Sequence, residues 1–144
     1  MGRVVVEALI QNAFDLDRVA AGELASDKVR TVDVSDALID TGAMMLSLPR
    51  RLISALGLRP TCQRQARTAA GLATMQIYSS AQVTIQGRDV VAEVAELPDE
   101  CPVLIGQIPL EGLDFVIDPV GQKLIGNPEH GGQHMIDMFW REFV

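Results

Sequence analysis

One aspartate stands where an apolar run meets a tight turn. The run is Ala37-Leu38-Ile39, and the turn is Asp40-Thr41-Gly42-Ala43. A carboxylate delivered to such a place by a buried strand can act as a general base on water. The competing interpretation is an aspartate that merely initiates a turn, but an apolar run leading into it is unusual for that role. The pattern favours a catalytic Asp40.

A second apolar run, Val103-Leu104-Ile105-Gly106, also ends in a turn residue. It forms a weak internal repeat with Leu38-Ile39-Asp40, since each has two apolar residues followed by a turn residue. The chain contains only one Asp-Thr-Gly. Any chemistry that needs two such carboxylates therefore needs two chains.

The elements that must position these residues are mostly short strands. Apolar residues alternate or run together in the segments expected to be strands, which are 3–12, 32–39, 75–85, 89–97, 113–117 and 123–125. One short helix is expected from Pro49 to Leu56, because proline suits a first helical turn and Gly57 suits the stop. These features predict an all-β domain over residues 1–125, a closed or sandwich-like barrel with one or two short helices.

The last nineteen residues, 126–144, form a separate segment. It begins with loop composition, and then apolar residues follow at helical spacing: Met135, Ile136, Phe139, Trp140, Phe143 and Val144. We expect an amphipathic helix over 133–144 that packs on the barrel or across a dimer interface. A less favoured alternative has this helix covering the active-site cleft.

Residues 3–125 resemble the retropepsin-like aspartic proteases, the small bacterial kind related to retroviral proteases. The resemblance rests on Asp-Thr-Gly-Ala at 40–43, the short helix ending in Leu56-Gly57-Leu58, a flap-like hairpin and Leu104-Ile105-Gly106, in this order. It implies a closed acid-protease barrel and an aspartic endopeptidase that hydrolyses peptide bonds.

The resemblance also implies roles for individual residues. Asp40 would activate water, and Thr41 would tie two active-site loops together through its hydroxyl. Gly42 would let the backbone approach the substrate. Leu104, Ile105 and Gly106 would pack behind the catalytic loop. Substrate would contact Ala43 and Met44 and the flap tip, which comprises Ala70, Gly71 and Leu72.

Two carboxylates within hydrogen-bond reach share one proton, so that one acts as base and the other as acid. Since one chain supplies only Asp40, the resemblance implies a homodimer in which each subunit contributes this residue. An alternative is a catalytically inactive module of the same fold that binds peptides or dimerises. Asp118 could be offered as a partner within the chain, but before Pro119 it more simply initiates a turn.

Three departures from the family pattern affect substrate preference. Met44 and Met45 stand where retroviral enzymes usually have acidic residues that bind the substrate backbone. Gln107 stands where they have arginine after the apolar-apolar-Gly motif, and the flap lacks their glycine-rich tip. These differences predict a more apolar cleft.

Composition excludes several other functions. The net charge is −7 and the longest basic cluster is Arg50-Arg51, so nucleic acid is not an expected partner. No apolar run is long enough to cross a membrane, and no signal peptide is expected, which favours a cytoplasmic protein. Cys62 and Cys101 are expected to be reduced thiols. No metal or cofactor is expected, because His130 and His134 lie in a glycine-rich loop.

Overall fold

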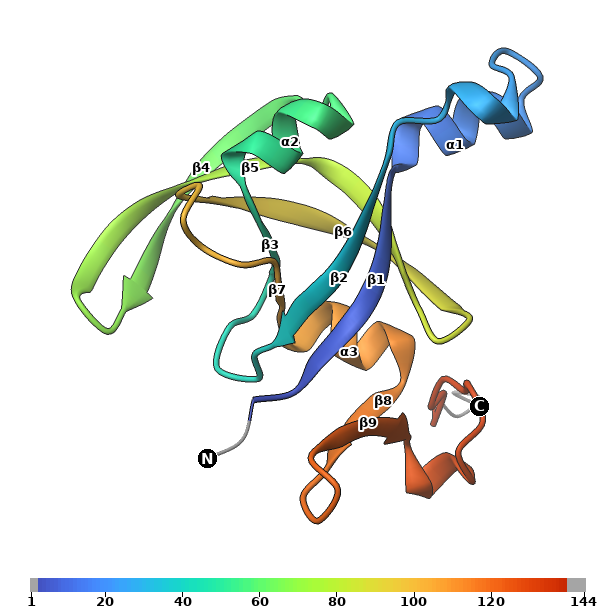
Figure 1. The fold of residues 1–144 in the computed structure, drawn as a ribbon, viewed down its shortest axis with the longest axis vertical. Coiled ribbons are helices and arrows are strands. Elements are labelled where there is room, and N and C mark those ends of the chain that lie inside the picture. Colours follow the sequence, from blue (N-terminus) through green and yellow to red (C-terminus); the bar gives the residue numbers. More distant parts are fainter. Residues whose placement is uncertain (1–2, 140–144) are drawn as a thin grey trace, which may run out of the picture.

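The computed structural model describes residues 3–139 (Figure 1). The elements, in chain order, are β1 Val5–Asn12, α1 Ala13–Ala20, the 3-10 helix Ser26–Lys28, β2 Thr31–Ile39, β3 Leu46–Pro49, α2 Arg50–Leu56, β4 Pro60–Thr68, β5 Gly71–Ile85, β6 Arg88–Leu97, β7 Leu104–Ile105, α3 Gln107–Leu113, β8 Phe115–Asp118, β9 Lys123–Gly126 and the 3-10 helix Pro128–His130. The chain is mainly β, as predicted.

Seven strands form one sheet, in the order β1-β2-β7-β3-β6-β5-β4, and β1 also pairs with β5. Six strands therefore form a ring, in the order β1, β2, β7, β3, β6 and β5, which the pairing of β5 with β1 completes. Strand β4 pairs with β5 and is not part of the ring. The finer description as a closed acid-protease barrel stays a prediction. The two-residue strand β7 lies between β2, to which it is parallel, and β3, to which it is antiparallel.

Alternating apolar residues of these strands fill the space that the ring encloses. The core cluster draws on most strands and on α2 and α3; its fully buried members include Ile10, Leu46, Leu48, Leu56, Val83, Val94, Ile105 and Leu113. Each such side chain contributes roughly 1.5–3 kcal/mol when removed from water. This packing holds the ends of β2 and β7 together, where the candidate site lies.

The sequence signals for α2 are confirmed. Pro49 is its N-cap, and Gly57 ends it in the left-handed conformation with φ 63°. The glycine suits this position because a side chain at positive φ is strained. The predicted strands 3–12, 32–39, 75–85, 89–97 and 123–125 are also present, and their ends differ from the predicted ones by at most four residues.

Two helices were not predicted. The first, α1, begins where Asn12 accepts a hydrogen bond from the backbone N–H of Asp15 at 3.0 Å. The second, α3, occupies residues 107–113, so the strand expected over 113–117 begins later, at Phe115. The described residues thus contain three α-helices in place of the one or two that we expected.

The prediction of a C-terminal helix over 133–144 is wrong for residues 134–139, which have no regular secondary structure. Trp140, Phe143 and Val144 lie outside the described residues. The helical spacing misled because polar contacts, not an apolar face, hold this segment. Among the described residues of the tail, Ile136, Met138 and Phe139 are exposed.

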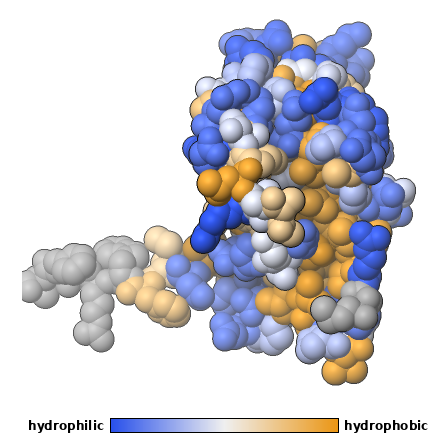
Figure 2. Space-filling model, turned by 90° about the vertical axis from the view of Figure 1, so that its left-hand side faces the viewer, coloured by the Kyte–Doolittle hydropathy of each residue, from blue (hydrophilic) through white to orange (hydrophobic). Residues whose placement is uncertain are grey.

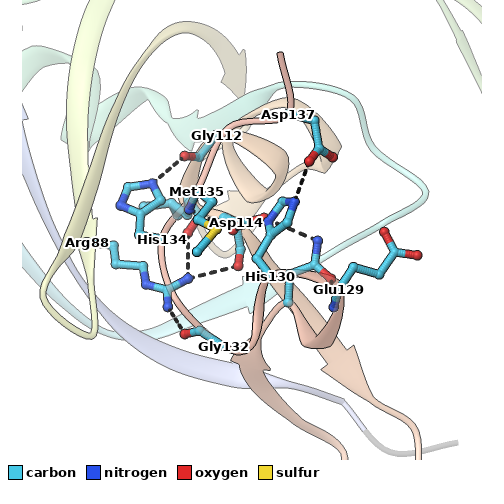
Figure 3. Close-up of polar contacts among 11 residues, drawn as sticks. Arg88, Gly112, Asp114, Glu129, His130, Gly132, His134, Met135 and Asp137 are labelled. Atoms are coloured by element: carbon cyan, nitrogen blue, oxygen red, sulfur yellow. Dashed lines mark hydrogen bonds and ion pairs between the residues drawn. The ribbon is translucent and has the colours of Figure 1, made fainter. Parts of the chain in front are cut away.

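These polar contacts join the tail to α3 and to the β5–β6 turn (Figure 3). The side chain of Asp114 accepts hydrogen bonds from the backbone N–H of Met135 at 3.0 Å and from Asn127 Nδ2 at 3.3 Å. His130 lies between two carboxylates, with Nδ1 2.6 Å from Asp114 and Nε2 2.8 Å from Asp137. We call these five residues the tail cluster.

Arg88 completes the attachment from the neighbouring hairpin. Its guanidinium donates to the carbonyl oxygens of Leu113, Asp114 and Gly132, at 3.2, 2.9 and 2.5 Å. The prediction of a solvated loop at His130 is therefore wrong, because only 10% of its side chain is exposed. No helix within residues 3–139 is long and apolar enough to cross a membrane.

Candidate active site

Asp40 lies directly after β2, at the point where β7 pairs with that strand. The parallel register places Ile39 beside Ile105, and the backbone N–H of Asp40 donates to the carbonyl of Ile105 at 3.0 Å. The chain then turns sharply, since the N–H of Ala43 donates to the carbonyl of Asp40 at 3.1 Å. The buried strand pair therefore fixes the backbone on which the carboxylate stands.

The Asp40 carboxylate itself is half-buried and accepts a hydrogen bond from the backbone N–H of Gly42 at 2.9 Å. Thr41 and Gly42 are both exposed. A Cβ at Gly42 would lie 3.2 Å from the same carboxylate oxygen, so a side chain there would crowd it. Within residues 3–139, the bond from Gly42 is the hydrogen bond that the Asp40 carboxylate accepts, and it engages one of the two carboxylate oxygens.

Gly106 supports this turn from behind. A Cβ at this position would lie 2.4 Å from the carbonyl oxygen of Met45, which the backbone could not accommodate without moving. The structure therefore explains the glycine of the second apolar motif by close backbone approach, not by a special φ. Leu104 and Ile105 form β7, so the second motif lies beside the Asp40 turn as expected.

Helix α3 is joined to the same turn by its first N–H groups. Those of Gln107 and Ile108 donate to the carbonyls of Ala43 and Met44, at 2.8 and 2.9 Å. The first N–H groups of a helix have no partner within the helix, so the turn supplies them. Sequence analysis missed this contact because nothing local marks a helix after Gly106.

An open groove of about 1090 Å³ runs between this turn and the β4–β5 hairpin. Figure 2, which looks at the side where the hairpin projects, shows apolar side chains gathered along it. Its apolar lining comprises Ala43, Met44, Met45, Leu46, Ala66, Met75, Ile77, Val91, Ala92, Ala95, Leu97, Leu104 and Ile108. A surface of this kind suits ligands that carry apolar groups.

The groove brings together some of the predicted substrate-binding residues. Gly42, Ala43 and Met44 line it, and Met44 is exposed beside the turn. On the hairpin side the lining within the described chain reaches Thr68. Ala70, Gly71 and Leu72 lie one step further out, at the exposed tip.

The hairpin tip has the geometry of a tight two-residue turn between Thr68 and Gly71. The Thr68 hydroxyl donates to the carbonyl of Gly71 at 2.7 Å, and Gly71 has φ 112°, a conformation that only glycine adopts easily. Leu72 is exposed. The tip therefore has a defined shape although it lacks a glycine-rich sequence.

Asp118, the two cysteines and a metal site were also considered in the sequence analysis. Asp118 caps the β8–β9 turn by accepting from the N–H of Val120 at 3.1 Å, which is the turn role expected for it. Within residues 3–139, no three His, Cys, Asp or Glu side chains are grouped as a metal site would require. Cys62 and Cys101 are free thiols.

A mainly β chain in which an Asp-Thr-Gly turn follows a buried strand, backed by a glycine motif and open to a groove, has the features of an acid protease. A family model described as an aspartyl protease matches residues 16–108. The chain belongs to this retropepsin-like aspartyl protease family. A search of curated proteins finds no match.

Proposed function

We propose that the protein is an aspartic endopeptidase that works as a homodimer, with a catalytic dyad formed by Asp40 of each subunit. The observation that carries the proposal is the position of Asp40. Its backbone is fixed by β7, one of its two carboxylate oxygens accepts no hydrogen bond within residues 3–139, and an apolar groove begins at the next residues of its turn, Gly42 and Ala43. A single such carboxylate can accept a proton from water but cannot also supply the proton that the carbonyl oxygen needs.

Exposure of the turn supports the dimer. Thr41 and Gly42 face solvent, so a second copy related by a two-fold axis has access to Asp40. In that arrangement the two carboxylates share one proton, the ionised one takes a proton from water, and the protonated one donates to the peptide carbonyl. The Thr41 hydroxyl would link the two loops across the axis.

The hairpin would close over the bound peptide and exclude water from the reaction. Ala70, Gly71 and Leu72 at its tip would then contact the substrate from above, while Ala43 and Met44 contact it from below. This movement is consistent with the exposed tip, which lies beyond the groove lining in the isolated chain. The protein would need no cofactor, and we propose that it acts in the cytoplasm.

Peptide cleavage over about pH 4–7, a range around shared-proton pKa values, tests the proposal. Wild type would be compared with Asp40→Asn and with Asp36→Asn, an exposed aspartate on the same segment that serves as the control. We expect turnover in the wild type and in the control, and none above background in Asp40→Asn. Activity retained in Asp40→Asn would contradict the mechanism.

Mixed subunits test the dyad directly. Wild-type and Asp40→Asn chains would be exchanged at varied ratios and assayed, with sedimentation used to count subunits. If both aspartates are required, activity per total dimer falls as the square of the wild-type fraction. A linear fall would mean that each chain is active alone. A dimer that cleaves no peptide would favour the alternative function, an inactive module for peptide binding or dimerisation.

A further inference from the structure

One wall of the apolar groove is charged. Among the residues that line it, Arg64 and Arg67 on β4 and Glu93 on β6 carry full charges at neutral pH. The wall therefore has an excess of one positive charge, in a chain whose net charge is −7. A cationic wall in an acidic protein would attract an acidic ligand to this part of the surface.

The geometry places Arg64 on the groove side of its strand. In the β4–β5 register Arg64 lies opposite Met75, so the two side chains share one face, and Met75 also lines the groove. Arg67 lies opposite Leu72, three residues along β4 from Arg64, so its side chain leaves the other face of the strand and lines the groove only at the end near the hairpin tip. Arg64 is therefore the cation best placed to meet a bound peptide.

The guanidinium of Arg64 has spare capacity for a ligand. Its Nη1 lies 3.8 Å from Oε1 of Glu93, which is long for an ion pair, and the two side chains are 58% and 49% exposed. Exposed pairs of this kind hold weakly. A guanidinium has five N–H donors, and a second carboxylate can bind it in two-point fashion.

We propose that Arg64, assisted by Arg67, selects peptides that carry an acidic side chain to one side of the apolar residues at the scissile bond. This inference rests on the proposed function, because it takes the groove as the place where the peptide lies. Glu93 competes with the peptide's carboxylate for Arg64. Its role is to weaken the preference, so Arg64 and Glu93 have opposite effects on specificity.

Binding is measured with the Asp40→Asn protein, in which we expect no cleavage of bound peptide. Fluorescently labelled peptides with a central Phe-Phe pair carry Glu, Gln or Lys, one at a time, at each of three positions on either side. We expect Glu to bind roughly two- to fivefold tighter than Gln at one position, the range that an exposed ion pair provides. The advantage shrinks as salt concentration rises.

Two substitutions separate recognition from a structural role. Arg64→Gln removes the preference for Glu over Gln, whereas Glu93→Gln strengthens it. Arg67→Gln reduces it by a smaller factor. The matched control is Arg59→Gln, since Arg59 stands just before β4 and its guanidinium lies 5.4 Å from the centre of the Phe14 ring, outside the groove lining.

The outcomes separate this inference from the proposed function. Asp40-dependent cleavage with equal affinity for Glu and Gln peptides overturns the inference and leaves the function standing. Selective binding of Glu peptides with no cleavage by the wild type supports the inference on specificity and contradicts the proposed protease function. If Arg64→Gln and Glu93→Gln weaken all peptides alike, the pair only holds the hairpin in place and the inference is wrong. No binding of any peptide also overturns it.

Discussion

Two aspartates that each follow the last residue of a secondary-structure element lie in opposite surroundings. Asp40, at the end of β2, accepts one hydrogen bond from a backbone N–H of its own turn and is half-buried. Asp114, at the end of α3, accepts from Met135 and Asn127 and contacts His130, and its side chain is only 7% exposed. These contacts lower the pKa of Asp114 to about 2, chiefly through the N–H of Met135 and then through His130.

The difference separates a structural carboxylate from one available for chemistry. A carboxylate has about four acceptor sites, and those of Asp114 are taken up by groups that hold the tail against α3. Asp40 is fixed through its backbone instead, by the carbonyl of Ile105 and by the turn to Ala43. Within residues 3–139, its side chain accepts the single hydrogen bond from Gly42, and under the proposed function the other oxygen binds water.

The largest effects are expected when the negative charge is removed from each aspartate in turn. Asp40→Asn should lower peptide cleavage by roughly 10²–10⁴-fold, the usual contribution of acid–base catalysis, and leave the thermal midpoint unchanged. Asp114→Asn should lower the midpoint and leave activity per folded molecule nearly unchanged. Thermal unfolding and active-site titration measure the two effects. The opposite assignment of effects would refute the comparison.

Gly106→Ala should lower both the stability of the protein and its peptidase activity. Its new methyl group would meet the carbonyl of Met45, so the turn that carries Asp40 must move. We expect a loss of about 1–3 kcal/mol in the free energy of unfolding, as for other overpacked sites, together with reduced kcat. Urea unfolding and cleavage assays measure these effects. Glu111→Ala, at an exposed position of α3, is the control and should change neither by much.

A third aspartate, Asp15, extends the comparison to an ion pair whose carboxylate is buried and whose arginine is partly exposed. It is 1% exposed, and its carboxylate accepts from the backbone N–H, Nε and Nη2 of Arg30, at 3.0, 2.8 and 2.8 Å. Asp15→Asn should cost about 1–3 kcal/mol of stability, because it leaves buried donors poorly matched. Urea unfolding measures the cost, and an equal loss of specific activity in the folded fraction would contradict a purely structural role.

The pH dependence of Asp15 follows from the same contacts. The hydrogen bond from the Arg30 side chain lowers the pKa of Asp15 below its usual value. A lowered pKa means that the pair stabilises the protein above about pH 4 and that this contribution is lost as pH falls through the folded-state pKa. The free energy of unfolding should therefore fall less between pH 6 and pH 3 in Asp15→Asn than in the wild type. Urea unfolding at each pH measures this difference.

The smallest effect concerns the tail cluster at neutral pH. Contacts first with Asp114 and then with Asp137 raise the pKa of His130. A raised pKa means that this contribution is complete below about pH 6.5 and is lost as pH rises through the folded-state value. Hydrogen exchange of residues 131–139 should therefore speed up from pH 6 to pH 8 beyond the intrinsic rate, and His130→Gln should remove that excess.

The control for this prediction is the other histidine. His134 Nε2 lies 3.0 Å from the carbonyl oxygen of Gly112, which is an uncharged partner (Figure 3). His134→Gln should leave the excess exchange of the wild type in place. An equal change in both variants would mean that the tail responds to loss of any ring, not to the charge of His130.

Much of the fold could be predicted from local signals. An apolar run predicted β1, alternating apolar residues predicted β5, and Pro49 and Gly57 predicted the bounds of α2, because these signals act through neighbouring backbone. Helix α3 could not be predicted, since its first N–H groups are satisfied by Ala43 and Met44, more than sixty residues earlier in the chain. In the tail a helix was predicted from the spacing of apolar residues, but residues 134–139 form no helix.

By itself the sequence determined that one carboxylate ends an apolar strand and that each chain has a single Asp-Thr-Gly. Those facts are local and depend on the order of residues alone. Only the tertiary structure decided that Gly106 must be glycine, that Arg64 of β4 lies beside Glu93 of β6 on one wall of the groove, and that His130 is held between Asp114 and Asp137. Each of these depends on groups far apart in the chain, which come together only when the apolar strands pack.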